Sequence, residues 1–160
     1  MKKKILVIGG TGFIGYHLLK KTTQLGWISI SASRSAPQKF RKVKKVKNLK
    51  INLQNSKDIK SKLKGKYDFV VNLIGNSEKS YITQIKNLIN FFSNKQIIKF
   101  IHIGSSAEYG NIKAPQKENM DGNPNSSYGI AKLAGTKLLL KLYSTNNFPV
   151  VILRFFQVYG

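Results

Sequence analysis

Short apolar runs alternate along the chain with longer segments in which apolar residues recur every three or four positions. The first pattern is typical of buried β-strands and the second of amphipathic helices. We therefore predict strands at Lys4–Ile8, Trp27–Ala32, Leu49–Leu53, Phe69–Leu73, Lys99–Ile103 and Val150–Leu153. Helices are predicted at Phe13–Leu25, Ser56–Lys64, Tyr81–Phe92 and Tyr128–Tyr143.

This alternation of strand and helix predicts an α/β fold. Right-handed crossovers between consecutive strands would build a doubly wound parallel sheet with helices on both faces. The third predicted helix has a clear apolar face, formed by Ile82, Ile85, Leu88, Ile89 and Phe92. With 160 residues, of which 41% are hydrophobic, the chain is long enough for one such domain over residues 1–160.

A glycine-rich turn follows the first predicted strand and precedes the first predicted helix. Gly9, Gly12 and Gly15 are spaced as Gly-x-x-Gly-x-x-Gly. A glycine permits the tight turn and a close backbone approach to a pyrophosphate, and the free amides at the start of a helix attract the anion. The segment is therefore predicted to hold the phosphates of a dinucleotide, the alternative being a glycine turn without a ligand.

Tyr128 and Lys132 lie four residues apart in the last predicted helix and therefore share one face. An ammonium next to a phenol favours the phenolate, so the pair is suited to proton transfer near neutral pH. Ser105 and Ser106 follow the fifth predicted strand, at the edge of a parallel sheet where ligands bind. Taken alone, these serines are better explained as residues that cap a turn.

The order of these three motifs resembles the extended branch of the short-chain dehydrogenase/reductase superfamily. Its nucleotide-sugar epimerases, dehydratases and ketoreductases carry segments similar to Ser105-Ser106-Ala107-Glu108-Tyr109-Gly110 and to Arg154-Phe155-Phe156-Gln157-Val158-Tyr159-Gly160. The resemblance runs along the whole chain and implies a Rossmann-type domain. It also implies hydride transfer at a carbinol or keto carbon of a nucleotide-linked sugar.

The resemblance implies a catalytic set of Ser105, Tyr128 and Lys132, with Ser106 in place of Ser105 if the register slips by one. Tyr128 would exchange a proton with the substrate oxygen, Ser105 would hydrogen-bond the same oxygen, and Lys132 would hold the phenolate charge and bond the nicotinamide ribose. Cofactor contacts are then expected from Gly9, Thr11, Gly12, Phe13, Ile14, Gly15, Ser33, Arg34, Asn52, Leu53, Asn72, Gly75 and Lys132.

The end of the second predicted strand bears on the choice of cofactor. Where an NAD-type enzyme has an acidic residue for the ribose hydroxyls, this chain has Ser33 followed by Arg34. An arginine can pair with a 2'-phosphate, and no carboxylate repels that group. We therefore expect NADP(H), with NAD(H) as the alternative; an arginine that contacts no ligand would leave the question open.

Two departures from the family pattern limit the reaction. Ser105-Ser106-Ala107 stands where sugar 4,6-dehydratases have Thr-Asp-Glu, so the acid and base for water elimination are missing and a dehydratase is not expected. Tyr81 replaces the Asn that the family has at the start of the helix predicted at Tyr81–Phe92. An epimerase or a ketoreductase remains.

The composition adds a complication, because the net charge is +22 and the segment Lys39–Lys50 is rich in lysine. Such a segment could bind nucleic acid or an anionic membrane. However, the charge is spread along the chain, and aromatic residues do not alternate with the basic ones as a single-strand platform requires. We expect neither partner. With no cysteine and only His17 and His102 as imidazole ligands, we expect no metal site.

Two further expectations concern the whole protein. We expect a cytoplasmic protein, compatible with a homodimer, that lacks the substrate-binding region found after the Val-Tyr-Gly segment in extended family members. A non-catalytic NAD(P)-binding module is the alternative to the enzyme, although such a module has no need for Ser105 and Tyr128.

Overall fold

The computed structural model describes residues 2–75 and 80–159, and its centre is a parallel β-sheet. The strands of this part of the chain are β1 (Lys4–Ile8), β2 (Ile28–Ser33), β3 (Lys47–Lys50), β4 (Phe69–Asn72), β5 (Lys99–Ser105) and β6 (Val150–Phe155). They lie in the order β3-β2-β1-β4-β5-β6. All neighbouring pairs are parallel, which confirms the predicted sheet.

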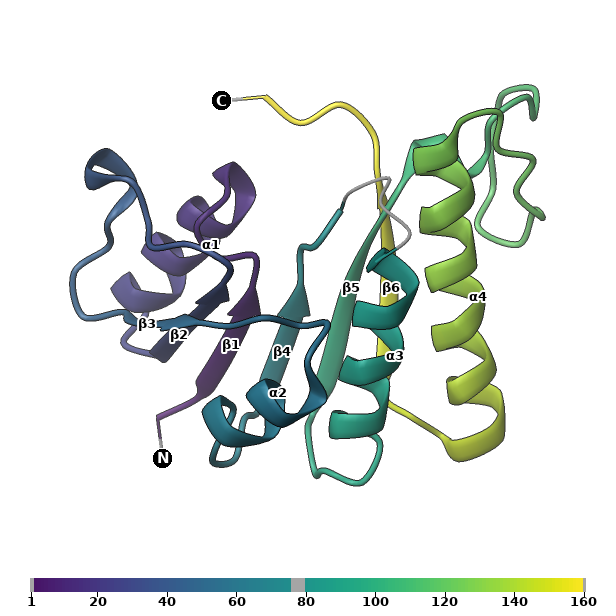
Figure 1. The fold of residues 1–160 in the computed structure, drawn as a ribbon. Helices are drawn as coiled ribbons and strands as arrows, with labels where there is room; N and C mark the ends of the chain where they lie inside the picture. The colour runs from purple at the N-terminus through teal and green to yellow at the C-terminus, as the bar shows by residue number, and fades with distance from the viewer. Residues whose placement is uncertain (1, 76–79, 160) are drawn as a thin grey trace.

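Helices cover both faces of the sheet (Figure 1). Helix α1 (Phe13–Gln24) lies on one face, and α2 (Ser56–Lys62), α3 (Ser80–Phe92) and α4 (Ser127–Asn146) lie on the other. Two short 3-10 helices, η1 (Lys39–Arg41) and η2 (Ser106–Glu108), belong to the loops after β2 and β5. The fold is therefore the predicted doubly wound, Rossmann-type arrangement.

The hydrophobic core is divided by the sheet into two layers. The larger layer joins β-strand residues such as Leu6 and Val70 to α2, α3 and α4, and it includes the fully buried Phe92 and Phe100. The smaller layer packs Leu19 of α1 against Ile5, Val7 and Val71. Side chains of one strand alternate between these layers, as expected of a sheet covered on both faces.

The third strand differs most from its prediction, because it spans Lys47–Lys50 instead of Leu49–Leu53. Its hydrogen-bonding register with β2 begins at Lys47, opposite Ile30. This edge strand is largely exposed and its sequence is polar. It therefore has no apolar run by which its position could be predicted. After Ile51 the chain turns, because the side chain of Asn52 accepts the N–H of Gln54.

Two other strands continue further than predicted. The pairing of β5 with β6 extends through Gly104 opposite Arg154 and Ser105 opposite Phe155. The remaining boundaries differ from the prediction by a few residues, as expected for helix and strand ends.

The carboxyl ends of the strands form the upper edge of the sheet in Figure 1. The strand order reverses between β1 and β4, and ligands of open α/β sheets bind at such a switch point. The turn after β1 and the segment after β4 meet there. The chain after β6 crosses above the same edge toward α1.

Candidate functional site

The glycine turn joins β1 to α1 at the switch point. Gly9 has φ 81°, a conformation that side chains disfavour, and its carbonyl accepts the N–H of Gly12 at 3.1 Å. A Cβ at Gly15 would lie 2.7 Å from the Gly9 carbonyl oxygen, so only glycine allows α1 to approach the turn this closely. Gly12 is the N-cap of α1, and no side chain caps it. The first amides of α1 thus form a cradle that fits an anion.

A hollow of about 240 Å³ opens beside this turn. Eight of the residues predicted to bind the cofactor line it: Gly9, Thr11, Gly12, Ser33, Arg34, Asn52, Leu53 and Gly75. The Thr11 N–H donates to Oγ of Ser33 at 3.2 Å, which ties the glycine turn to the end of β2. Gln84 of α3 also lines the hollow. Sequence reasoning missed it, because helical spacing placed it beside the apolar face without indicating a ligand.

The other five predicted cofactor contacts do not line this hollow, and Lys132 is the one described separately below. Phe13 and Ile14 line a neighbouring hollow with Val158 and Tyr159. Gly15 is buried against the glycine turn. Asn72 is fully buried, and its amide is bonded to His102 and to the N–H of Ile74. Asn72 as a cofactor contact stays a prediction; its side chain is enclosed within the protein by these hydrogen bonds.

Lys132 of α4 reaches into the centre of the site and is only 2% exposed. Its ammonium donates to the carbonyl oxygens of Ile74 at 2.9 Å and Ile103 at 2.6 Å, at the ends of β4 and β5. Burial lowers the pKa of Lys132 to about 8, and the nearby carboxylate of Glu108 opposes that effect. This ammonium therefore loses its proton more readily than that of an exposed lysine.

Tyr128 and Gly75 lie next to this ammonium. Nζ of Lys132 is 5.9 Å from the centroid of the Tyr128 ring. A Cβ at Gly75 would lie 3.2 Å from Nζ of Lys132 and 3.5 Å from the Tyr128 hydroxyl, so the absence of a side chain there lets both groups face the segment after β4. The predicted phenol and ammonium thus share one place at the carboxyl edge of the sheet.

Ser105 ends β5 and caps η2. Its Oγ accepts the N–H of Ala107 at 3.2 Å, which leaves the hydroxyl proton free to be donated to another group. Gly129 allows this turn to pack against the first turn of α4, because a Cβ there would collide with the Ala107 carbonyl. Ser105 therefore caps a turn, which is the interpretation that this serine suggests when taken alone. The capped turn contacts α4, the helix that carries Tyr128.

Glu108 fixes the Ser105 turn to the sheet and was not singled out from the sequence. It is fully buried; Oε1 accepts the Ser105 N–H at 2.8 Å and Oε2 accepts Nε–H of Arg154 at 3.0 Å. Arg154 comes from β6 and lies over the ring of Tyr109, with Cζ 4.6 Å from its centroid. Both residues stood in the segments that carry the family resemblance, which was the available signal.

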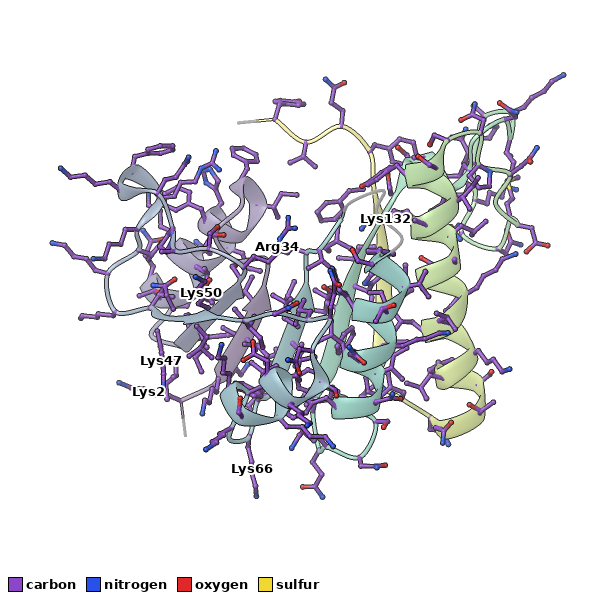
Figure 2. The ribbon with its side chains drawn as sticks, viewed as in Figure 1. Lys2, Arg34, Lys47, Lys50, Lys66 and Lys132 are labelled. Carbon is purple, nitrogen blue, oxygen red and sulfur yellow. The ribbon has the colours of Figure 1, made fainter. Side chains whose placement is uncertain are left out.

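Arg34 is exposed in the loop after β2 and lines the hollow beside the glycine turn. A second, smaller hollow of about 110 Å³ adjoins it and is lined by Thr11, Ser31, Ser35, Ala36, Asn48, Leu49 and Lys50. Oγ of Ser31 is buried there without a hydrogen-bond partner. Figure 2 shows Arg34 and Lys132 toward the upper edge of the sheet, whereas Lys2 and Lys66 lie toward its lower edge.

Over residues 2–75 and 80–159, no three His, Cys, Asp or Glu side chains gather closely enough to hold a metal ion. In the same residues, no helix is both long and apolar enough to span a bilayer.

Comparison with known proteins connects this geometry to a family. Residues 5–160 match the model of the NAD-dependent epimerase/dehydratase family. A Bacillus subtilis (strain 168) protein described as the uncharacterized UDP-glucose epimerase YtcB is 33% identical over 98% of this chain and 57% of its own length. Protein CapI of Staphylococcus aureus is 31% identical over 98% of this chain and 54% of its own length.

Among solved structures, UDP-glucuronic acid 4-epimerase from Bacillus cereus, in complex with UDP-glucuronic acid and NAD, superposes with a TM-score of 0.81. The two sequences are 26% identical, over 100% of this chain and 58% of that one. The chain thus spans a little over half the length of the relatives it matches. These matches, together with the glycine turn and the Tyr128–Lys132 pair, show that the chain belongs to the NAD-dependent epimerase/dehydratase family, within the extended short-chain dehydrogenases.

Proposed function

We propose that this chain is the dinucleotide-binding part of an NAD(P)-dependent epimerase that acts on a nucleotide-linked sugar. The observation that carries the proposal is the buried ammonium of Lys132, which lies beside the Tyr128 ring and Gly75 at the switch point of the sheet. A simple binding module could use this cation for the cofactor ribose, but it has no need for the phenol of Tyr128 beside it.

The residues present fit a dinucleotide. The uncapped start of α1 suits a pyrophosphate, and the hollow between Ser33, Asn52 and Gly75 leads from it along the carboxyl edge of the sheet. When bound, the nicotinamide supplies the acceptor and donor of hydride. Lys132 would bond its ribose, and the glycine turn would hold its phosphates.

The acid–base chemistry belongs to side chains of this chain. The Tyr128 phenolate would take the proton of the substrate hydroxyl on the carbon that exchanges hydride with a bound nicotinamide. Ser105 donates its hydroxyl proton to the same oxygen and so keeps it in place. Tyr128 would give the same proton back when the ketone is reduced to the epimeric carbinol, so that its phenolate is restored at the end of the cycle.

An epimerase is preferred to a ketoreductase because related proteins are described as UDP-sugar epimerases. The two reactions differ in stoichiometry: an epimerase regenerates its cofactor, whereas a ketoreductase consumes one NAD(P)H per turnover. Incubation of the protein with UDP-glucose or UDP-glucuronic acid, followed by NMR of the sugar signals and by NADPH absorbance, separates them. Cofactor binding without conversion in either assay, by protein that carries a substrate-binding region, would support a non-catalytic module.

Replacing the catalytic phenol tests the mechanism directly. Tyr128→Phe removes the exchangeable proton but keeps the ring beside Lys132, so we expect turnover to fall by about 100-fold or more while the dissociation constant of NAD(P)H stays within about twofold. Tyr143→Phe is the control, because Tyr143 lies on the same helix with its side chain exposed. Retention of most of the turnover by Tyr128→Phe would show that the proton donor is misassigned.

For the cofactor we propose NADP(H) in preference to NAD(H). Arg34 lines the hollow beside the glycine turn, and the adjoining smaller hollow is lined by Lys50 and by Ser31, whose buried Oγ has no hydrogen-bond partner. Such donors suit a phosphate on the ribose 2'-oxygen. The Bacillus cereus enzyme was solved with NAD, so the preference is a property proposed for this chain alone.

Calorimetric titration with adenosine 2',5'-bisphosphate and with 5'-AMP tests this preference, since the two ligands differ only in the 2'-phosphate. We expect the bisphosphate to bind at least about tenfold more tightly, and Arg34→Ala to remove most of that difference. Lys47→Ala, a cation of β3 that lines neither hollow, should have little effect. Equal affinities that Arg34→Ala does not change would exclude the NADP(H) preference.

We also propose a homodimer, because α4 exposes the large apolar side chains of Ile130, Leu140 and Tyr143, which a partner could cover. Analytical ultracentrifugation tests it. The cytoplasmic location and the separate substrate-binding region stay predictions.

A further inference from the structure

A chain of hydrogen bonds runs behind the site through three fully buried side chains, Asn72, His102 and Tyr81. Nδ2 of Asn72 lies 2.9 Å from Nδ1 of His102, and the Tyr81 hydroxyl lies 3.1 Å from Nε2 of the same ring. These contacts link the end of β4, the middle of β5 and the start of α3. The proposed mechanism uses none of the three groups.

A backbone group fixes the direction of these hydrogen bonds. The Ile74 N–H donates to Oδ1 of Asn72 at 3.3 Å, so the amide nitrogen is the group that faces His102. Because that nitrogen can only donate, Nδ1 of His102 accepts, and the neutral ring carries its proton on Nε2. Nε2–H in turn donates to the Tyr81 hydroxyl oxygen. Burial, with a smaller contribution from the Lys132 charge, lowers the pKa of His102 to about 3, which keeps the ring neutral.

Lys132 closes this chain into a ring of contacts. Its ammonium donates to the carbonyl of Ile74, the residue whose N–H begins the chain, and lies 5.4 Å from the centroid of the Tyr81 ring. The other titratable groups around it are Tyr128, His102 and Glu108. A displacement of Tyr81 would therefore disturb the Lys132 ammonium in two ways. It would change the contact between the ammonium and the Tyr81 ring, and it would shift the Ile74 carbonyl to which the ammonium donates.

We propose that Tyr81 is a positioning residue which, through His102 and Asn72, fixes the backbone at Ile74 and so holds the Lys132 ammonium beside the Tyr128 ring. The role of Lys132 in binding a cofactor rests on the function proposed above. The position of its ammonium beside Tyr128 does not depend on that function. Tyr81 occupies the place where extended family members have Asn, so this chain would hold its lysine by a different group.

Tyr81→Phe tests the proposal, because it removes the hydroxyl but keeps the ring over Lys132. Nε2–H of His102 is then left unpaired in a buried place, and a water that enters to pair with it also solvates the ammonium. NMR titration of the protein with ¹⁵N- and ¹³C-labelled lysine follows Lys132, whose signal is the one lost in Lys132→Arg. We expect its midpoint to rise by roughly one pH unit and the affinity for NADPH to fall about fivefold.

Tyr67→Phe is the matched control. It also removes the hydroxyl of a buried tyrosine, one that donates to the Lys64 carbonyl at 3.3 Å and lies in the core away from Lys132. We expect it to lower stability while the Lys132 midpoint and the NADPH affinity stay at wild-type values. No change in Tyr81→Phe, or the same change in both variants, would overturn the proposal.

A measurement on the unmodified protein keeps the proposal testable if Tyr81→Phe does not fold. ¹⁵N NMR of His102 should show a neutral ring protonated on Nε2 from about pH 5 to about pH 9. A ring protonated on Nδ1, or one that titrates in this range, would overturn the proposal. If the wild-type protein binds no NAD(P)H while Lys132 and His102 behave as expected, the proposed function is wrong and the positioning role stands.

Discussion

At the scale of single residues, the site is governed by a cation that is expensive to bury. Lys132 is 2% exposed and satisfies its ammonium with two backbone carbonyls instead of a carboxylate. Burial therefore lowers its pKa to about 8, although Glu108 opposes the shift. The folded protein gives up this proton more readily than the unfolded chain does.

This difference makes stability depend on pH. Between the folded pKa of about 8 and the unfolded value of about 10.4, the unfolded chain binds more protons at Lys132 than the folded protein does. The free energy of unfolding therefore rises with pH across this window. The gain is lost again as the pH falls toward 8. The contribution is about 3 kcal/mol at most. We expect wild-type protein to gain stability relative to Lys132→Met between about pH 8 and pH 10, as measured by urea unfolding. Parallel pH profiles for the two proteins would contradict the shifted pKa.

At the scale of secondary structure elements, the site depends on how η2 is fastened to β5 and β6. Glu108 is the fastening residue, because one carboxylate oxygen holds the Ser105 N–H and the other holds Arg154. The two ends of this ion pair are 46 residues apart, and the carboxylate is fully buried. Loss of one partner leaves the other charge poorly solvated.

We predict that Glu108→Gln lowers the free energy of unfolding by about 3 kcal/mol, since it leaves the Arg154 guanidinium without a counter-charge. Urea unfolding measures the change. Lys62→Gln is the comparison, because the Lys62–Asp58 pair within α2 is more exposed and its loss should cost less than about 0.5 kcal/mol. Similar effects of the two substitutions would show that the buried Glu108–Arg154 pair contributes no more to the free energy of unfolding than the exposed pair does.

At the scale of the whole molecule, charge is strongly unbalanced. Lys and Arg number 28 against 6 Asp and Glu, and the cations are spread over both edges of the sheet in Figure 2. Mutual repulsion of these charges opposes the compact state, and salt screens it. We therefore expect the urea midpoint of unfolding to rise when NaCl is increased from about 10 mM to about 500 mM. A midpoint that falls with salt would show that the few ion pairs outweigh the repulsion.

Local features of the sequence by themselves determined the fold and much of the site. The helical spacing of Tyr128 and Lys132 and the glycines after the first strand are short-range patterns, and parallel topology brings strand ends to one edge. The Lys47–Lys50 strand was placed too late because an exposed edge strand carries no apolar signal. Apolar patterns mark a strand only where its side chains are buried, and most of those in this strand are exposed.

The tertiary structure alone decided which groups meet beneath the site. Asn72 pairs with His102 across 30 residues, Tyr81 with His102 across 21, and Lys132 with the Ile74 carbonyl across 58. No periodicity connects positions so far apart, because each pairing depends on strand order and on the packing of α3 and α4 against one face of the sheet. The sequence was therefore enough to propose Ser105, Tyr128 and Lys132 as candidate reacting side chains, whereas the buried groups that lie behind them were decided only by the folded chain.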